Sequence, residues 1–321
     1  MYEDIRVKLS FLELVFPPIS NQEAYWLKDQ PVADYMRASD FYMIGGKMKS
    51  KFSNLVACDK TLSVTFDLFV GSERKSSGLI NVMELDAVAN YDGQDFYVRG
   101  NENSIEIVYQ KHEDYYVIER FTPENILWHR SREINGLSGL DNYSELSVYD
   151  LLYVGIAKEG DSYDRLIKNG HHARLDILAN EPQRYPGARV SDEIFLFLFR
   201  IEPLFMTSFG SNSPIDLDFE YEHKKIVADA EKAFVNLLKP DYNSVKFKQY
   251  PKGKDGLFDS KLDRYSYSIG EFLTFNTPHG RIKGGRDRLL GGLNNKADFI
   301  FVDKKKSTLY IAGVDFEDPI A

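Results

Sequence analysis

Three side chains in the second half of the chain have the types and the order that phosphodiester chemistry would need. Tyr153 lies in an apolar run expected to form a strand, Arg165 follows where a helix is expected to begin, and Glu231 lies on a later helix. A phenol can pass a proton or orient water, a guanidinium matches phosphate oxygens, and a carboxylate can hold a hard cation such as Mg²⁺. Together they offer water activation, charge compensation and metal binding.

Taken singly, each of these residues has an ordinary structural explanation. Tyr153 could be a core tyrosine, and Arg165 could pair with Asp161 or Asp164 on the helix surface. Glu231 lies at the edge of the apolar face of its helix, where it could pair with a neighbouring lysine. The functional hypothesis therefore depends on the three residues occurring together.

Three further residues could support such a site. His172 lies on the apolar side of the helix expected after Arg165, where a neutral imidazole could act as a base or contact phosphate. Gly155 follows Tyr153 and lets a backbone or a substrate approach closely. Asn243 could brace the end of the helix that carries Glu231, which is a structural contribution.

The order of these residues, over about 148–243, resembles the GIY-YIG nuclease superfamily. In that family a Tyr-Ile-Gly strand precedes an arginine at a helix start, and a third strand leads to a helix whose glutamate binds one divalent metal. The family domain often closes with Pro-x-Tyr-Asn. The matching segments here are Tyr153-Val154-Gly155, Arg165, the expected strand 193–201, Glu231 and Pro240-Asp241-Tyr242-Asn243.

The resemblance implies a metal-dependent endonuclease that is expected to act on DNA. By this resemblance Glu231 binds Mg²⁺ or Mn²⁺, Arg165 stabilises the phosphate, and Tyr153 acts with a second residue to activate water. Similar domains occur in restriction enzymes, homing endonucleases and phage-defence proteins. A place in restriction or phage defence is therefore suggested by the resemblance and not by the residues themselves.

The family's first motif, Gly-Ile-Tyr, has no counterpart at the expected distance before Tyr153. Tyr143 has the right distance but lies in a segment poor in strand-forming residues, and Tyr149 has a better context but lies too close. The general base is therefore open among Tyr143, Tyr149 and His172. The long interval between Arg165 and Glu231 indicates an insertion within 179–192 or 203–218. A fold that had lost catalysis would show the same departures.

Charge is unevenly distributed along this acidic chain. The net charge is −9, yet residues 245–306 hold 14 Lys and Arg against 7 Asp and Glu, a net of +7. A basic stretch can bind a polyanion, although a solvated, lysine-rich surface is the ordinary alternative. Residues 278–288 are rich in Gly and Arg and are expected to form a mobile basic loop. The residues expected to contact nucleic acid are Lys246, Lys248, Lys252, Arg281, Lys283, Arg286 and Arg288.

Length and pattern predict an α+β protein of three parts. The expected parts are a β-rich domain over 1–130, a GIY-YIG-like α/β domain with a small central sheet over 131–250, and a basic, β-rich extension over 251–321. The single cysteine, Cys58, allows no intrachain disulfide, and no apolar run is long enough to cross a bilayer. We expect a cytoplasmic protein that does not bind membranes, with a homodimer or a regulatory ligand at the first domain as options.

The competing hypothesis is a catalytically inactive fold. In that case the motifs are structural remnants, and the protein binds nucleic acid without cutting it or docks a protein partner. Convergence of Tyr153, Arg165, a histidine and Glu231 around one cleft would favour the enzyme, because a metal and a phosphate must share that cleft. A Glu231 that points at a lysine on the outer surface would favour the inactive fold.

Overall fold

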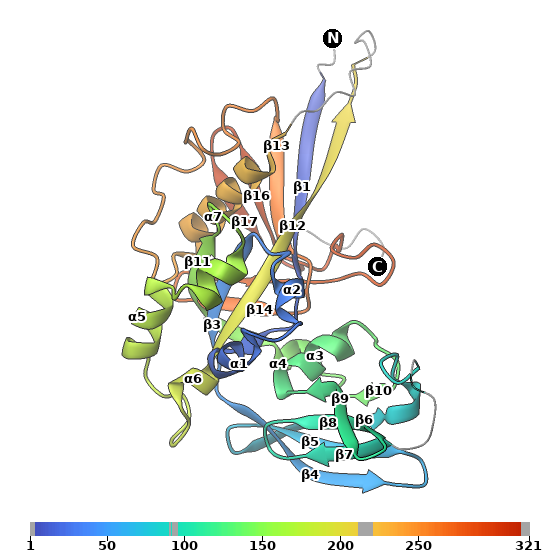
Figure 1. Cartoon of the computed structure of the whole chain (residues 1–321). Helices are drawn as coiled ribbons and strands as arrows, with labels where there is room; N and C mark the ends of the chain where they lie inside the picture. The colour runs from blue at the N-terminus through green and yellow to red at the C-terminus, as the bar shows by residue number, and fades with distance from the viewer. Residues whose placement is uncertain (1–3, 90, 92–95, 211–220, 316–321) are drawn as a thin grey trace.

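The computed structural model describes residues 4–89, 91, 96–210 and 221–315 as a mixed α+β structure, rich in strands and with few helices (Figure 1). Its largest element is a curled ten-stranded sheet in the order β15-β14-β11-β3-β12-β1-β13-β16-β17, with β2 paired to β12. The strands are β1 (Ile5–Leu14), β2 (Ile19–Ser20), β3 (Phe41–Gly46), β11 (Val148–Ile156), β12 (Ile194–Ser208), β13 (Arg264–Ile269), β14 (Thr274–Thr277), β15 (Gly280–Lys283), β16 (Phe299–Asp303) and β17 (Ser307–Tyr310).

The first half of β12 is buried on both faces of this sheet. Phe197 and Phe199 pack into one hydrophobic core with helix α7, whereas Leu196 and Leu198 pack into a second core on the opposite face. An unbroken apolar run is what a strand covered on both faces requires. The covering helical segments are α7 (His223–Leu238) on the first face, and α1 (Asn21–Leu27), α2 (Ala33–Met36), η2 (Asp164–Lys168) and α5 (His172–Asn180) on the second.

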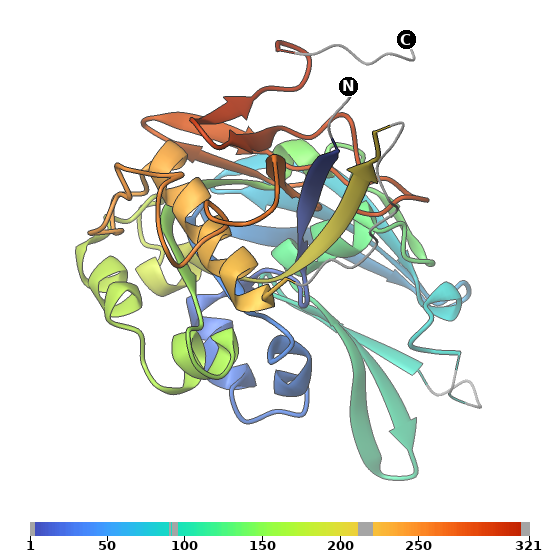
Figure 2. The same cartoon turned by 90° about the horizontal axis from the view of Figure 1, so that it is seen from above.

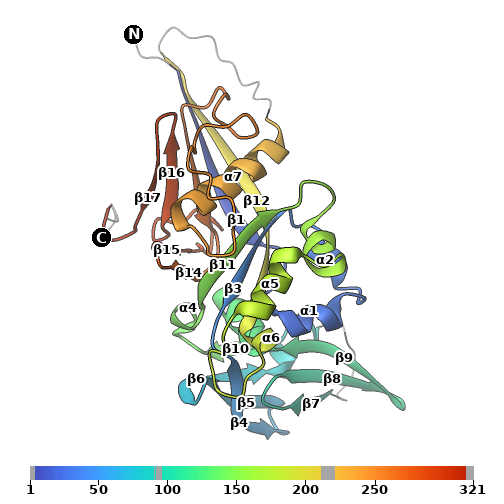
Figure 3. The same ribbon diagram turned by 90° about the vertical axis from the view of Figure 1, so that its left-hand side faces the viewer.

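The segment between β3 and β11 forms two smaller sheets around a hydrophobic core of its own. Figure 3 shows these strands gathered at one end of the molecule, and in Figure 2 the β8–β9 hairpin projects on the side opposite the C-terminal strands. We call residues 50–146 the inserted domain. Its elements are β4 (Ser50–Cys58), β5 (Ser63–Val70), β6 (Glu73–Asn81), η1 (Val82–Glu84), β7 (Phe96–Gly100), β8 (Ile105–Lys111), β9 (Asp114–Phe121), α3 (Pro123–Ser131), β10 (Leu137–Gly139) and α4 (Tyr143–Leu146).

The arrangement of the sheets differs from the expected three parts. The large sheet takes strands from each of the ranges 1–130, 131–250 and 251–321, and so runs across both expected boundaries; it is also larger than the small central sheet that was expected. The pattern of a single strand does not identify its partners, and β1 and β3 therefore look like any other N-terminal strands in the sequence.

Two local expectations can also be compared with the structure. Residues 278–288, expected as a mobile loop, contain β15, which pairs with β14 and buries Ile282 between two exposed basic residues. Between Arg165 and Glu231, the interval 179–192 contains the start of α6 (Val190–Glu193), and part of 203–218 lies outside the described residues. Among the residues described, no helix has both the length and the apolar character needed to cross a membrane.

Candidate functional site

Tyr42 on β3 is the centre of a polar cluster that the sequence motifs did not reveal. Its side chain is fully buried, and its ring stacks on that of Tyr153, with centroids 6.1 Å apart and planes at 22°. The His171 ring meets both tyrosines edge-on, at 5.5 Å from Tyr42 and 5.1 Å from Tyr153. β3 and β11 are antiparallel neighbours, and this pairing brings Tyr42 to the strand that carries Tyr153.

Gly155 makes room for the Tyr42 ring. The two residues are register partners across β3 and β11, and a Cβ atom at position 155 would lie 2.6 Å from Cζ and from the hydroxyl oxygen of Tyr42. Atoms do not approach that closely, so only glycine fits without movement of the tyrosine. The structural contribution expected of Gly155 therefore has a specific cause.

A β-bulge points Tyr153 towards this cluster. Leu151 pairs with Gly45 and Tyr153 pairs with Ile44, so Leu152 is an extra residue on β11. Leu151 packs into the core on the α7 side, whereas Leu152 and Tyr153 both pack on the Tyr42 side. Without the bulge, strict alternation would place Tyr153 on the same face as Leu151.

Two nitrogen atoms contact the Tyr42 hydroxyl oxygen. The Arg165 Nε–H donates to it at 3.0 Å, and the Nε2 atom of His171 lies 2.9 Å from it. His171 is the N-cap of α5, and its Nδ1 accepts a hydrogen bond from the Arg174 backbone N–H at 3.4 Å. Because Nδ1 is then an acceptor, we assign the proton of the neutral ring to Nε2, which donates to Tyr42.

Burial and charge set the protonation states of these groups. Burial, reinforced by the charges of Arg165 and Arg174, lowers the pKa of His171 to about 4, so this ring is neutral at physiological pH. Burial also raises the pKa of Tyr42 well above its ordinary value, and so does the nearby Tyr153, while Arg165 opposes the change. Two donors on the Tyr42 oxygen would stabilise its phenolate if the proton were removed.

Glu231 brings negative charge to the same cluster from helix α7. Its carboxylate is half-buried, and burial raises its pKa to about 7, against the opposing charges of Lys158, Arg165 and Lys232. The charge of Glu231 in turn contributes to the raised pKa of Tyr153. Lys232 pairs with Asp255 instead, and no described residue forms a hydrogen bond or an ion pair with Glu231.

The segment 240–243 fastens the end of α7 to β11. Lys239 adopts a left-handed conformation at the C-cap of the helix, which Pro240 prevents from continuing. Asn243 accepts a hydrogen bond from the Val154 N–H at 2.9 Å and donates to the Val154 carbonyl at 2.8 Å. Asn243 thus braces the strand between Tyr153 and Gly155, beyond the end of the helix that it was expected to brace.

Three of the expected catalytic residues lie outside the cluster. His172 is 91 % exposed and pairs with Asp176, because the helix begins there and its N-cap, His171, points inward. Tyr149 is buried on the α7 face of the sheet and donates to Glu124. Tyr143 lies on α4, with its ring 5.4 Å from that of Phe272.

The expected nucleic-acid contacts fall into two groups. Some are engaged within the protein: Lys246 donates to the Lys239 and Pro240 carbonyls, Arg286 pairs with Glu13, and Arg288 pairs with Glu133. The others extend into solvent without an ion pair to any described residue: Lys248, Lys252, Arg281 and Lys283. Only the second group is free to bind a phosphate backbone without first breaking an internal contact.

Glu231 offers the oxygen atoms of a single carboxylate to a metal ion. Within the described part of the chain, no group of three or more His, Cys, Asp or Glu side chains forms a ready metal site. Glu231 fits the alternative in which one carboxylate holds a hard cation that keeps several waters. Comparison with protein-family models, with curated protein sequences and with solved structures finds no match for this chain.

Proposed function

We propose that this protein is a divalent-metal-dependent endonuclease with a divergent GIY-YIG-like core. The observation that supports it most is the convergence of Tyr42, Tyr153, Arg165 and His171 from separate elements, with Glu231 on α7 close enough to act on this cluster electrostatically. Tyr42 and Tyr153 lie on adjacent strands, so Tyr42 supplies the first-motif tyrosine that the segment before Tyr153 lacks. Arg165 is exposed, and an incoming phosphate can reach its guanidinium.

In this proposal each side chain has a defined task. Glu231 would hold Mg²⁺ or Mn²⁺, which supplies positive charge to the phosphate and favours loss of a proton from a nearby phenol. Arg165 offsets the charge that develops on the phosphate oxygens. Tyr42, after losing its own proton to solvent, would accept a proton from the attacking water as the bond from oxygen to phosphorus forms; the phosphorus bond to the departing sugar oxygen breaks, and that oxygen takes up a proton from solvent.

His171 and Tyr153 position the base in this proposal. The neutral His171 ring holds the Tyr42 oxygen through Nε2, and the stacked Tyr153 ring leaves the Tyr42 ring little room to turn. Lys248, Lys252, Arg281 and Lys283 would hold the nucleic-acid backbone, and their contribution depends strongly on salt. DNA remains the proposed substrate, in keeping with the family resemblance.

Cleavage of supercoiled plasmid and of single strands, in Mg²⁺, Mn²⁺ or EDTA, tests the proposal. We expect metal-dependent nicking that Glu231→Gln and Arg165→Ala abolish, and that His172→Ala, an exposed control beside His171, retains. Absence of cleavage in every metal, with salt-sensitive nucleic-acid binding retained, would replace the proposal with the inactive binding module. Cleavage that persists in both Glu231→Gln and Arg165→Ala would place the chemistry elsewhere.

A further inference from the structure

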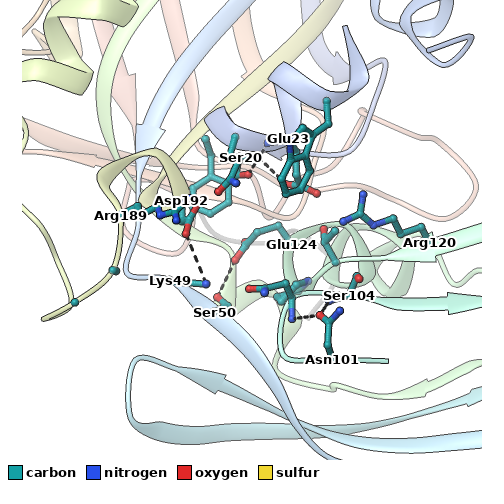
Figure 4. A pocket seen from close by; sticks show the side chains of 18 residues that line it. Ser20, Glu23, Lys49, Ser50, Asn101, Ser104, Arg120, Glu124, Arg189 and Asp192 are labelled. Atoms are coloured by element: carbon teal, nitrogen blue, oxygen red, sulfur yellow. Dashed lines mark hydrogen bonds and ion pairs between the residues drawn. The ribbon is translucent and has the colours of Figure 1, made fainter. Parts of the chain in front are cut away.

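A cavity of about 480 Å³ lies between the inserted domain and the helices α1 and α6 (Figure 4). Its volume is within the range of small-molecule sites. Its lining comes from residues 20–26 around the start of α1, from Lys49 and the inserted domain up to Glu124, from residues 187–192, and from Phe195 on β12. No lining residue belongs to the Tyr42 cluster, so this is a second, distinct site.

The cavity offers an aromatic face beside side-chain amides. Trp26 is 49 % exposed, and the Arg120 guanidinium lies 5.8 Å from the centre of its ring. Gln22, Asn101 and Asn103 line the same cavity. A planar ring can stack on an indole, and carboxamides can pair with the donor and acceptor edge of a nucleobase.

The three acidic residues of the lining, Glu23, Glu124 and Asp192, are already engaged within the protein; Asp192 pairs with Lys49 at 3.6 Å. Buried Glu124 accepts hydrogen bonds from Lys47 at 2.9 Å and from Ser50 at 2.8 Å (Figure 4 labels Ser50 and Glu124). Glu23 accepts from the Ser20 backbone N–H at 2.8 Å in a capping box. These carboxylates are therefore not free to repel an anion as isolated charges.

Two arginines of the lining have capacity left for an anion. Arg189 is exposed, and no described side chain pairs with its guanidinium. Arg120 reaches Glu106 only at 3.7 Å, and its buried Nε has no hydrogen-bond partner among the described residues. Guanidinium groups are suited to phosphate oxygens because they donate in a planar fork. Figure 4 shows Arg120 and Arg189 on opposite sides of the cavity, which thus combines a stacking face, amides and one guanidinium on each side.

We propose that this cavity binds a nucleotide unit, with its base stacked on Trp26 and paired to the amides and its phosphate on the Arg189 guanidinium. A free nucleoside monophosphate and a nucleotide turned out of a strand offer the same chemistry, and the experiment separates these two sources. The inference does not depend on cleavage. The inserted domain would on this account give the protein a second nucleotide contact away from Glu231.

Intrinsic fluorescence tests the site directly, because Trp26 is one of only two tryptophans in the chain. The full-length protein in EDTA is titrated with AMP, GMP, CMP and TMP, with an eight-nucleotide single strand, and with inorganic phosphate as the control. We expect quenching by at least one mononucleotide or by the strand, with at least tenfold weaker affinity by calorimetry in Trp26→Ala and in Arg189→Ala. Tyr25→Ala, an exposed aromatic on the same helix outside the lining, should retain wild-type affinity.

Each outcome has a definite meaning. Mononucleotide binding that Trp26→Ala weakens supports a free ligand, and binding of the strand alone with the same sensitivity supports an extruded nucleotide. No quenching by any nucleotide, or affinity unchanged in both Trp26→Ala and Arg189→Ala, overturns the inference. Plasmid cleavage by the same preparation, measured separately, shows whether the proposed nuclease activity stands when this inference fails.

Discussion

The hydroxyl oxygen of Tyr42 lies 3.0 Å from Nε of Arg165, although 123 residues separate them in the chain. The contact joins β3 to the helical turn η2, and His171 approaches the same oxygen at 2.9 Å. Arg165 is thereby held against the two tyrosines, and its exposed side chain can still donate to a phosphate. A phosphate bound there would lie beside the tyrosine that the proposal uses as a base.

Removal of the Tyr42 hydroxyl should abolish most cleavage while leaving the fold intact. Positioned acid–base groups contribute about 10²- to 10⁴-fold, so Tyr42→Phe is expected to lower the single-turnover rate by about 100-fold or more. The matched control is Tyr143→Phe, because Tyr143 lies outside the cluster. The single-turnover rates are compared at equal concentrations of folded protein. A Tyr42→Phe rate within twofold of the wild-type rate would exclude this tyrosine as the base.

Gly155→Ala should disturb both stability and the cluster. The new Cβ would meet the Tyr42 ring at 2.6 Å, and overpacking of this kind costs about 1–3 kcal/mol of unfolding free energy. Gly280→Ala is the control, since a Cβ there meets nothing within 4 Å and its backbone is not left-handed. Urea denaturation measures both variants. Equal unfolding free energies for Gly155→Ala and Gly280→Ala would show that the Tyr42 ring can move aside without loss of stability.

Asn243→Ala should loosen the strand that carries Tyr153. It leaves the N–H and the carbonyl of Val154 without their buried partner, and each loss costs about 1–3 kcal/mol. Asn180→Ala, an exposed amide on α5, should cost far less. Thermal and urea unfolding give the comparison. If Asn243→Ala is no less stable than Asn180→Ala, the two hydrogen bonds from Asn243 to Val154 do not contribute to stability.

The stability contribution of Glu231 should depend on pH in a defined direction. Burial raises its pKa from 4.5 to about 7 in the folded protein, so the unfolded chain ionises first and the folded carboxylate becomes an unfavourable charge as pH rises through this window. Glu231→Gln should therefore gain unfolding free energy relative to wild type between about pH 4.5 and pH 7, and the difference should level off above.

The difference between the two proteins is the quantity to measure, in EDTA, because burial also raises the pKa of Glu271 to about 7. The pH dependence of wild-type stability alone would contain the contributions of both Glu231 and Glu271. A difference that does not change with pH would mean that Glu231 is not a desolvated carboxylate. Metal binding requires the ionised form, so Mg²⁺ affinity should rise over the same interval.

The basic residues of the C-terminal region should contribute unequally to nucleic-acid binding. Lys252→Ala and Arg281→Ala should each weaken binding of any sequence and reduce the salt slope by about one, because each removes one backbone contact. Arg288→Ala should matter less, since Arg288 already pairs with Glu133. Lys60→Ala on the inserted domain is the control. Salt slopes equal to the wild-type slope in both Lys252→Ala and Arg281→Ala would show that these two residues do not contact the nucleic-acid backbone.

Local patterns in the sequence locate the main elements of the candidate site. The apolar run expected to form a strand around Tyr153 is β11, the strand expected over 193–201 lies in β12, and the helix that carries Glu231 ends at Leu238, shortly before Pro240. Each depends on residues close in sequence: continuous apolar character for β12, amphipathic spacing for α7, and a proline that ends the helix.

The residues that complete the cluster depend on contacts that such patterns do not contain. The inserted domain separates Tyr42 from Tyr153, and a search confined to the segment before Tyr153 therefore could not find it. Tyr42-Met43-Ile44-Gly45 is an apolar, glycine-ended run, the one signal that a search of the whole chain could have used. The bulge at Leu152 depends on pairing between strands, and its effect on Tyr153 is not visible in the sequence.

The most direct test of the central claim is the rate of Mg²⁺-dependent plasmid nicking by Glu231→Gln, measured beside Glu222→Gln. Glu222 precedes the same helix and is exposed, so this control has the same chemical change without the cluster. The account predicts loss of at least 100-fold for Glu231→Gln and wild-type rates for Glu222→Gln, with both proteins folded. Equal nicking by the two variants would contradict a metal-dependent site at Glu231.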